Sequence, residues 1–207
     1  MNEAEALGLP AHAFGKQDDG GDAAFYAPAR LVTHIDPPAV AALTGFYRTH
    51  LPVGADVLDL MSSWVSHLPD DLPLAVIGHG MNAAELAANP RLDRWFLADL
   101  NQRPVLPEPD DSLDAVLACV GVQYLQRPLA VFGEARRVLR PGGIAIVSFS
   151  NRCFPTKAVA VWQALDMHGR AALVSLYLAR AGFTALETHV LADGRASDPL
   201  VAVIGRA

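Results

Sequence analysis

The stretch RWFLADLNQRPVLPEPDDSLDAVLACVGVQYLQRPLAVFGEARRVLRPGGIAIVSFSN, residues 94–151, decides the fold. Residues 113–120 are almost wholly apolar, which is typical of a strand buried on both faces of a parallel sheet. Pro128 can begin a helix in its first turn, and the Pro-Gly-Gly run at 141–143 ends that helix. A second apolar strand follows over 144–149. This order of elements predicts a crossover unit of an α/β sheet.

The same stretch resembles the class I S-adenosylmethionine (SAM)-dependent methyltransferases. Asp99 stands where that family has an acidic residue after its third strand. Residues 109–114 contain the D-x-S-x-D part of its P-x-x-D-x-S-x-D approach to the fourth strand, and residues 134–143 match its E-x-x-R-V-L-x-P-G-G helix end. Over residues 25–151 the chain is also similar to an uncharacterised methyltransferase-like group. The resemblance implies SAM as the cofactor and S-adenosylhomocysteine as the product.

The remaining sequence fits one α/β domain. Apolar residues make up 52% of the 207 residues and charged residues 18%, which suffices for one sizeable core. We expect a flexible leader over 1–24, an N-terminal helical lid over 25–52 and a methyltransferase-like domain over 53–207. The alternating patterns predict a Rossmann-like, doubly wound sheet, and the resemblance implies seven strands with an antiparallel last strand. Strands are expected over 56–60, 74–78, 94–98, 113–120, 143–149, 183–191 and 200–205, and a long helix over 155–181.

Composition argues against several kinds of partner. The formal net charge is −6 and there is no cluster of Lys and Arg, so nucleic acid is not expected. No apolar run approaches the roughly 20 residues of a membrane helix, and the acidic start is unlike a signal peptide. Cys119 and Cys153 lack metal-ligand spacing, so no metal is expected. We expect a cytoplasmic protein with a small-molecule substrate, and leave a homodimer open.

The loop after the first expected strand departs from the family pattern V-L-D-x-G-x-G-x-G. Asp59 is kept, but the three glycines, which allow positive φ and close ligand approach, are replaced. In one reading the hydroxyls of Ser62 and Ser63 and the first amides of a following helix bind the SAM carboxylate. In the other reading Ser62 only caps that helix. The residues in place of the glycines are Met61, Ser63 and Val65.

The end of the second expected strand also differs from the family. Gly80 stands where the resemblance implies a ribose-binding acid, and Met81 follows at the position of an apolar residue on the adenine face. Asn82 either caps the next helix or, like His79, reaches the ribose.

The third and fourth expected strands complete the implied cofactor site. There the Asp99 carboxylate would accept from the adenine amino group and the Leu100 N–H would serve a ring nitrogen, unless Asp99 only shapes a turn. Val120, at the end of the fourth expected strand, is taken as a further cofactor-binding residue.

Polar residues that follow the fourth and fifth expected strands are candidates for the methyl acceptor. Gln123 and Tyr124 can position an acceptor through hydrogen bonds, with Tyr124 taken as catalytic. Asn151 or Arg152 can meet a substrate carboxylate. In the alternative reading these side chains only solvate the ends of loops.

Residues 25–36 are dense in functional side chains. Arg30 is expected to pair with the SAM carboxylate, Tyr26 to contact substrate and His34 to act as a general base near neutral pH. Ordinary packing is the alternative for His34.

The reading favoured is methyl transfer from SAM to a small molecule by direct displacement, which needs alignment and desolvation more than a strong base. The alternative is a catalytically inactive methyltransferase-like binding or regulatory module, favoured by the lost glycines and the lost acid.

Overall fold

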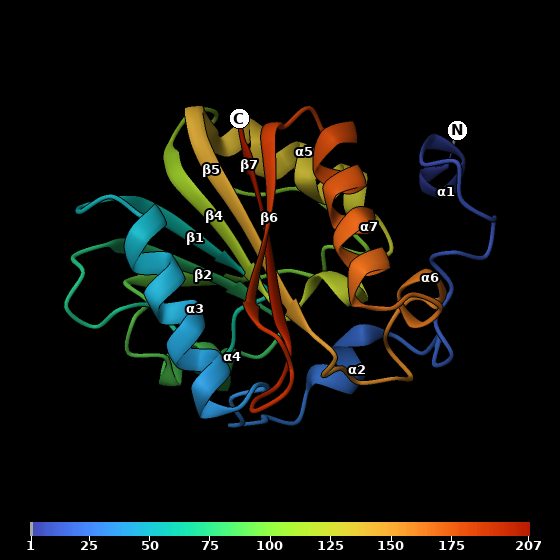
Figure 1. Cartoon of the computed structure of the whole chain (residues 1–207), viewed down its shortest axis with the longest axis horizontal. Coiled ribbons are helices and arrows are strands. Elements are labelled where there is room, and N and C mark those ends of the chain that lie inside the picture. The colour runs from blue at the N-terminus through green and yellow to red at the C-terminus, as the bar shows by residue number, and fades with distance from the viewer. Residues whose placement is uncertain (1) are drawn as a thin grey trace.

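A seven-stranded sheet forms the centre of the protein (Figure 1), for which a computed structural model describes residues 2–207; Met1, part of the expected leader, lies outside them. The strands are β1 (Asp56–Leu60), β2 (Ala75–Gly80), β3 (Arg94–Leu97), β4 (Leu113–Cys119), β5 (Leu139–Ser150), β6 (Thr184–Ala192) and β7 (Leu200–Arg206). Their order is β3-β2-β1-β4-β5-β7-β6. β7 is antiparallel to both β5 and β6, and the pairs from β3 to β5 are parallel. The predicted Rossmann-like sheet is confirmed.

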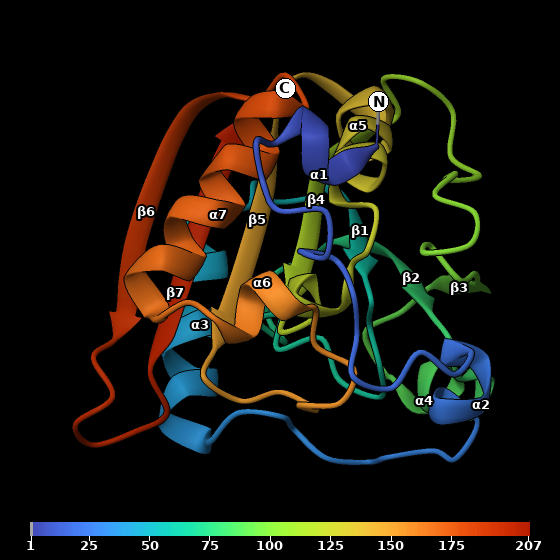
Figure 2. The ribbon, with the colours of Figure 1, turned by 90° about the vertical axis from the view of Figure 1, so that its right-hand side faces the viewer.

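Helices cover both faces of the sheet (Figures 1 and 2). They are α1 (Glu3–Ala6), α2 (Asp22–Tyr26), α3 (Pro37–His50), α4 (Ala83–Ala88), α5 (Pro128–Val138), α6 (Ala160–Gln163) and α7 (Met167–Arg180), with a 3-10 turn at Val122–Tyr124. On one face Leu43 and Tyr47 of α3 pack against alternate apolar residues of β1, β4, β5 and β7. On the other face Phe132 of α5 and Tyr177 of α7 pack against the remaining set. Period-two alternation of buried side chains therefore builds both cores.

The carboxyl edge of the sheet is where the strand order reverses, because β1 lies between β2 and β4. Ligands of open α/β sheets bind at such a point. In Figure 2 the chain from α2 to α3 runs along this edge of the sheet. The N-terminal segment thus crosses the place where a ligand is expected.

Residues 61–74, between β1 and β2, are irregular, so the helix expected after β1 is absent. Two prolines fall in this segment and polar side chains fix its path. The Asn89 amide donates to the Ser63 carbonyl at 2.9 Å and to Ser66 Oγ at 2.9 Å, and Thr44 Oγ1 donates to the His67 carbonyl at 2.8 Å. The prediction of helix N-terminal amides beside Ser62 and Ser63 is therefore wrong.

Residues 2–24 pack against the domain, in contrast to the flexible leader expected from their composition. The Glu3 carboxylate accepts from the first amides of α5, Leu129 N at 2.8 Å and Ala130 N at 3.2 Å. Leu7 and Phe14 are buried in the same core as α5 and α7. The chain then passes from α1 to α2 across the sheet (Figure 2).

A buried ionic cluster, which we call the N-terminal anchor, fixes this segment. It consists of Lys16, Asp18, Asp22 and Lys157. Lys16 Nζ lies 2.6 Å from Asp22 Oδ2, and Lys157 Nζ lies 3.1 Å from Asp18 Oδ2 and 3.4 Å from Asp22 Oδ1. Lys157 also donates to the Gly20 carbonyl at 2.6 Å. The two lysine side chains are only 3% and 1% exposed, so each positive charge depends on these partners.

The long helix expected over 155–181 is divided into α6 and α7. Asp166 begins α7 as its N-cap, because its side chain accepts from Gly169 N at 2.8 Å. Within residues 2–207, none of the helices combines the length and the apolar character that crossing a membrane demands.

Candidate functional site

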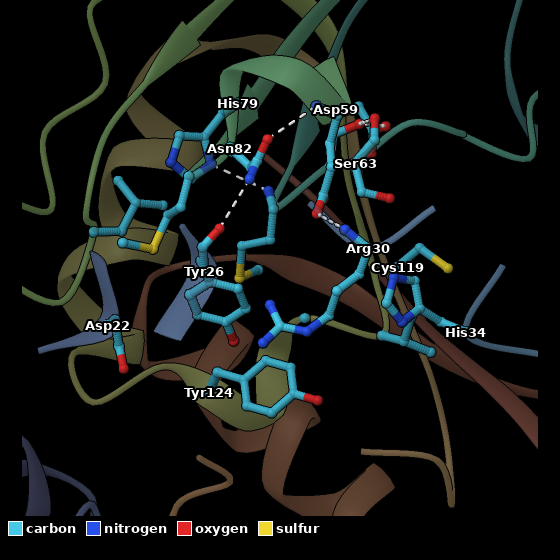
Figure 3. A pocket seen from close by; sticks show the side chains of 18 of the residues that line it. Asp22, Tyr26, Arg30, His34, Asp59, Ser63, His79, Asn82, Cys119 and Tyr124 are labelled. Carbon is cyan, nitrogen blue, oxygen red and sulfur yellow. Dashed lines mark hydrogen bonds between the residues drawn. The ribbon is translucent and has the colours of Figure 1, made fainter. Parts of the chain in front are cut away.

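A cavity of about 1060 Å³, partly open to solvent, lies at the carboxyl edge of the sheet (Figure 3). Its wall comes from the ends of β1 to β4 and from the N-terminal segment. Every residue predicted to bind the cofactor lines it, as do Tyr26, His34 and Tyr124. The sequence therefore located the cavity, and the ligand contacts stay predictions. The cofactor candidates on the wall are Arg30, Asp59, Met61, Ser62, Ser63, Gly80, Met81, Asn82, Asp99, Leu100 and Val120.

Asp59 is a buried acid at the end of β1. Its side chain is 3% exposed, and Ser62 Oγ donates to its Oδ2 at 2.6 Å. Burial raises the Asp59 pKa to about 6, although hydrogen bonds from Ser62 and Ser66 oppose the shift. The carboxyl therefore titrates close to neutral pH, and a cation in the cavity would favour its charged form.

Met61 adopts the backbone conformation usually given to glycine, with φ of 56°. The glycines that let the chain pass close to this loop lie instead at the ends of the neighbouring strands, at Gly80 and Gly121. A Cβ added to Gly121 would lie 2.8 Å from Met61 Cβ, and one added to Gly80 would lie 2.6 Å from the Ser62 carbonyl oxygen. Gly80 therefore leaves no room for the acid that the family places there.

His79 and Asn82 use their hydrogen bonds within the protein. His79 accepts from Met61 N at 3.1 Å and donates to the Ala98 carbonyl at 3.0 Å; burial lowers its pKa to about 4, so the ring is neutral. The Asn82 side chain caps α4 and donates to the carbonyls of Tyr26 at 3.0 Å and Ala27 at 2.9 Å. These bonds fix the first loop and the N-terminal segment, and give no support to a ribose contact by either residue.

Asp99 shapes a turn and lines the cavity as well. Its Oδ1 accepts from Asn101 N at 2.9 Å and Gln102 N at 3.3 Å. Met81 and Leu100 add apolar surface to the same wall. Apolar side chains beside a carboxylate are suited to bind a flat ring that carries an amino group.

Arg30 reaches into the cavity toward Tyr26 and Tyr124 (Figure 3). Its guanidinium lies 4.5 Å from the centre of the Phe25 ring and 5.3 Å from that of Phe154. It donates to the Phe25 carbonyl at 2.9 Å and to the Pro28 carbonyl at 3.3 Å, and its backbone N–H donates to Glu85 at 2.7 Å. Only the remaining guanidinium N–H groups are left for a ligand carboxylate.

A smaller hollow of about 440 Å³ adjoins the cavity and contains Arg152. His34 and Tyr124 line both spaces. Burial, and to a lesser degree Arg30, lowers the His34 pKa, while burial raises that of Tyr124 to about 12. Tyr124 Oη accepts from Phe154 N at 2.8 Å, and Arg152 Nε donates to Asp198 at 2.9 Å. The hollow thus offers neutral hydrogen-bonding groups beside one exposed cation.

Two substrate candidates do not line either space. Gln123 is buried, and its amide donates to the Val120 carbonyl at 2.7 Å, whereas Asn151 is exposed to solvent. Their assignment from sequence position is therefore corrected: each is next to a lining residue, but its side chain lies elsewhere.

His67 is a cavity residue that the sequence reasoning missed. Its side chain is 6% exposed and lies on the wall, eight residues beyond Asp59. Of six non-glycine residues with positive φ among those described, four line this cavity: His34, Met61, His67 and Val120. Backbone strain gathers at functional sites, and this gathering is the structural signal that identifies His67.

Comparison with known proteins agrees with this site. Residues 76–147, which run from β2 to β5, match the family model described as a methyltransferase domain. Over this segment the chain is similar to SAM-dependent methyltransferases.

One curated methyltransferase, malonyl-[acyl-carrier protein] O-methyltransferase of Hahella chejuensis, is 39% identical over 72 residues. These residues are 35% of this chain and 22% of that protein, so the likeness extends over about a fifth of the relative's length. A SAM-dependent methyltransferase structure from Archaeoglobus fulgidus aligns over 81% of this chain and 93% of its own, with a TM-score of 0.63 and 13% identity. One from Aquifex aeolicus aligns over 83% and 93%, with a TM-score of 0.60 and 16% identity. At these identities the structures show a shared fold.

Similarity to this methyltransferase family implies SAM as the cofactor, and the cavity fits that group. Asp59 supplies an anion for a cationic ligand, Asp99 and Leu100 border an apolar slot, and the His67 Nδ1 is a buried nitrogen without a partner inside residues 2–207. Among the residues described, no three His, Cys, Asp or Glu side chains are grouped to hold a metal ion.

Proposed function

We propose that this chain transfers the methyl group of SAM to a small-molecule acceptor by direct displacement. The observation that carries the proposal is that two neighbouring spaces share lining residues. The cavity that holds Asp59 and Asp99 at family positions and the hollow that contains Arg152 are both lined by His34 and Tyr124. A donor and an acceptor can then lie in contact, which is what displacement needs.

SAM, when bound, supplies an electrophilic methyl group on a sulfonium cation. Asp59 would lie near the sulfonium of SAM, because its carboxyl group is the buried acid at the end of β1. Met81 and Leu100 would flank the adenine, and Asp99 would accept from its amino group. The Ser62 hydroxyl donates to the Asp59 carboxylate, so in this proposal Ser62 fixes Asp59 and does not contact SAM itself. Ser63 remains a candidate for binding the carboxylate of SAM.

The protein's own groups would orient the acceptor and exclude water. Tyr26 and Tyr124 lie with ring centres 6.4 Å apart, and Phe154 stacks on Tyr124 at 6.0 Å. In this proposal the aromatic side chains would shield the reacting atoms from solvent. His34, held neutral by burial, can accept a proton from the acceptor, and Arg152 can bind an acceptor carboxylate.

The inactive module remains the second candidate, favoured by two observations. Gly80 has no room for a ribose acid, and Arg30 spends two donors on carbonyls of its own segment. A module of this kind would bind SAM or its product without transferring the methyl group.

Two measurements separate these proposals. Calorimetry of the full chain should detect S-adenosylhomocysteine binding, with Asp193→Ala, an exposed substitution far along the chain, as the unaffected control. Incubation with methyl-labelled SAM and a panel of hydroxyl, amine and carboxylate compounds should then release labelled product. Absence of binding at millimolar ligand would overturn both proposals, whereas binding without transfer to any class would favour the module.

A further inference from the structure

The end of β2 lies between the two acids that the proposed function assigns to SAM. In the sheet order β3-β2-β1, Asp99 follows β3 and Asp59 stands near the end of β1. The adenine would lie beside Asp99 and the sulfonium near Asp59. The ribose joins these two parts of SAM, so it is expected over the end of β2, where the proposed function names no partner for its hydroxyls.

Most cavity residues from β2 to α4 have no polar atom left for a ribose hydroxyl. The residues concerned are His79, Gly80, Met81, Asn82 and Glu85. Both ring nitrogens of His79 are hydrogen-bonded within the protein, and the Asn82 amide donates to two backbone carbonyls of the N-terminal segment. Gly80 has no side chain and Met81 carries no N–H or O–H group. Glu85 is the remaining polar side chain of this group.

The Glu85 carboxylate is fixed at one oxygen and free at the other. Its Oε1 accepts from Arg30 N at 2.7 Å. Its Oε2 has no partner within residues 2–207 and is not one of the buried polar atoms left unpaired there, so this oxygen stays accessible. The side chain is half-buried and lines the cavity. A side chain that is already held loses little further freedom when it binds a ligand.

We propose that the Glu85 carboxylate accepts hydrogen bonds from the ribose hydroxyls of SAM. This inference rests on the proposed function, since it names a further binding residue for the same cofactor. An ionised carboxylate only accepts, and each of its oxygens has two lone pairs, whereas a hydroxyl can donate. Oε2 can take one hydroxyl, and Oε1 can take the other while it still accepts from Arg30 N. Hydrogen bonds to a charged acceptor are among the stronger ones.

The position of Glu85 also explains how the chain manages without an acid at Gly80. A Cβ at Gly80 would lie 2.6 Å from the Ser62 carbonyl oxygen, so no carboxylate can be attached there. Glu85 brings a carboxylate to the same part of the wall from α4. Because the same carboxylate holds Arg30 N, the ribose and the N-terminal segment would share one anchoring residue.

The test compares S-adenosylhomocysteine with its 2′-deoxy and 3′-deoxy analogues by calorimetry on the full chain. The wild type should bind S-adenosylhomocysteine about tenfold or more tightly than either analogue, and Glu85→Ala should bring this ratio to about twofold or less. Loss of the bond to Arg30 N would weaken all three ligands alike, so it cancels in the ratio. Glu85→Gln, which keeps one acceptor oxygen, should give an intermediate ratio. Glu187→Ala, an exposed acid of β6 at the other edge of the sheet, is the control and should keep the wild-type ratio.

A wild-type ratio near one, or a wild-type ratio retained by Glu85→Ala, would overturn the inference. If the variants fail to fold, the wild-type chain still decides through the Glu85 carboxyl resonance of glutamate-labelled protein. That resonance should move with S-adenosylhomocysteine and stay nearly unchanged with the 2′,3′-dideoxy analogue, and identical responses contradict the proposal. A wild-type chain that binds none of these ligands refutes the proposed function itself, whereas binding with a ribose preference that does not depend on Glu85 refutes this inference alone.

Discussion

Replacing Asp59 with Asn tests the energetic cost of the buried acid. Burial raises its pKa from 3.8 to about 6, which corresponds to about 3 kcal/mol. The sign follows from linkage: between these values the unfolded chain is ionised while the native carboxyl keeps its proton. The contribution of Asp59 to stability is thus fully present below the unfolded pKa and is lost as the pH rises to about 6.

Asparagine removes this dependence and keeps an oxygen for the Ser62 hydroxyl. At a pH of about 8 the variant should be more stable than the wild type by about 2–3 kcal/mol, and the gain should vanish near a pH of about 4. Urea denaturation across that range measures the difference, with the exposed Asp70→Asn in the loop after β1 as control. A variant that is less stable at a pH of about 8, or a difference independent of pH, would refute the reasoning.

Asp59→Asn should lower the affinity for SAM more than it lowers the affinity for S-adenosylhomocysteine. SAM alone carries the sulfonium charge, so its binding gains an attraction to the Asp59 anion that S-adenosylhomocysteine lacks. The variant is then expected to be more stable and to bind the cofactor more weakly, which is a common trade-off at binding sites. Equal loss for both ligands would place Asp59 away from the sulfonium.

Three other substitutions test separate parts of the structure. Asp22→Ala should destabilise the protein by about 3–5 kcal/mol in urea denaturation, because it removes a partner from two buried lysines; a loss below about 0.5 kcal/mol would contradict the anchor. Asp99→Ala should cost about 1–3 kcal/mol of SAM binding by calorimetry without loss of fold, and unchanged affinity would leave Asp99 as a turn residue only. Gly121→Ala should lower stability by about 1–3 kcal/mol in thermal denaturation, because the new methyl group would collide with Met61. The control is Gly133→Ala in α5, where a new methyl group would have nothing within 4 Å and should cause no loss. Similar losses for both variants would show that crowding is not the cause.

The sheet was predictable because its evidence is local. The central strands β2, β4, β5 and β7 are marked by apolar runs, and the chain order leaves few ways to arrange such runs. The site followed from the same rule, since the carboxyl ends of parallel strands meet at one edge. Asp59, Gly80 and Asp99 are brought together on that ground alone.

What the sequence did not reveal depends on distant partners. Residues 2–24 look like a polar leader, yet Lys16 and Asp22 belong to a cluster completed by Lys157, far along the chain. His67 was overlooked because it lies in an irregular segment whose path is set by Asn89 and Thr44. Asn151 was misplaced because it follows the end of β5, where successive side chains point to opposite sides. Gln123 was misplaced because it lies in a 3-10 turn, where its amide donates to the Val120 carbonyl.

The N-terminal anchor has a consequence for the surface chemistry of the whole protein. Lys16 and Lys157 are the chain's two lysines, and both side chains are almost fully buried. The folded protein therefore exposes no lysine amine, so acylating reagents and amine-directed cross-linkers should find no lysine to modify. Acylation of Lys16 or Lys157 would report that the N-terminal segment has opened, which makes ordinary amine labelling a chemical sensor of access to the cavity.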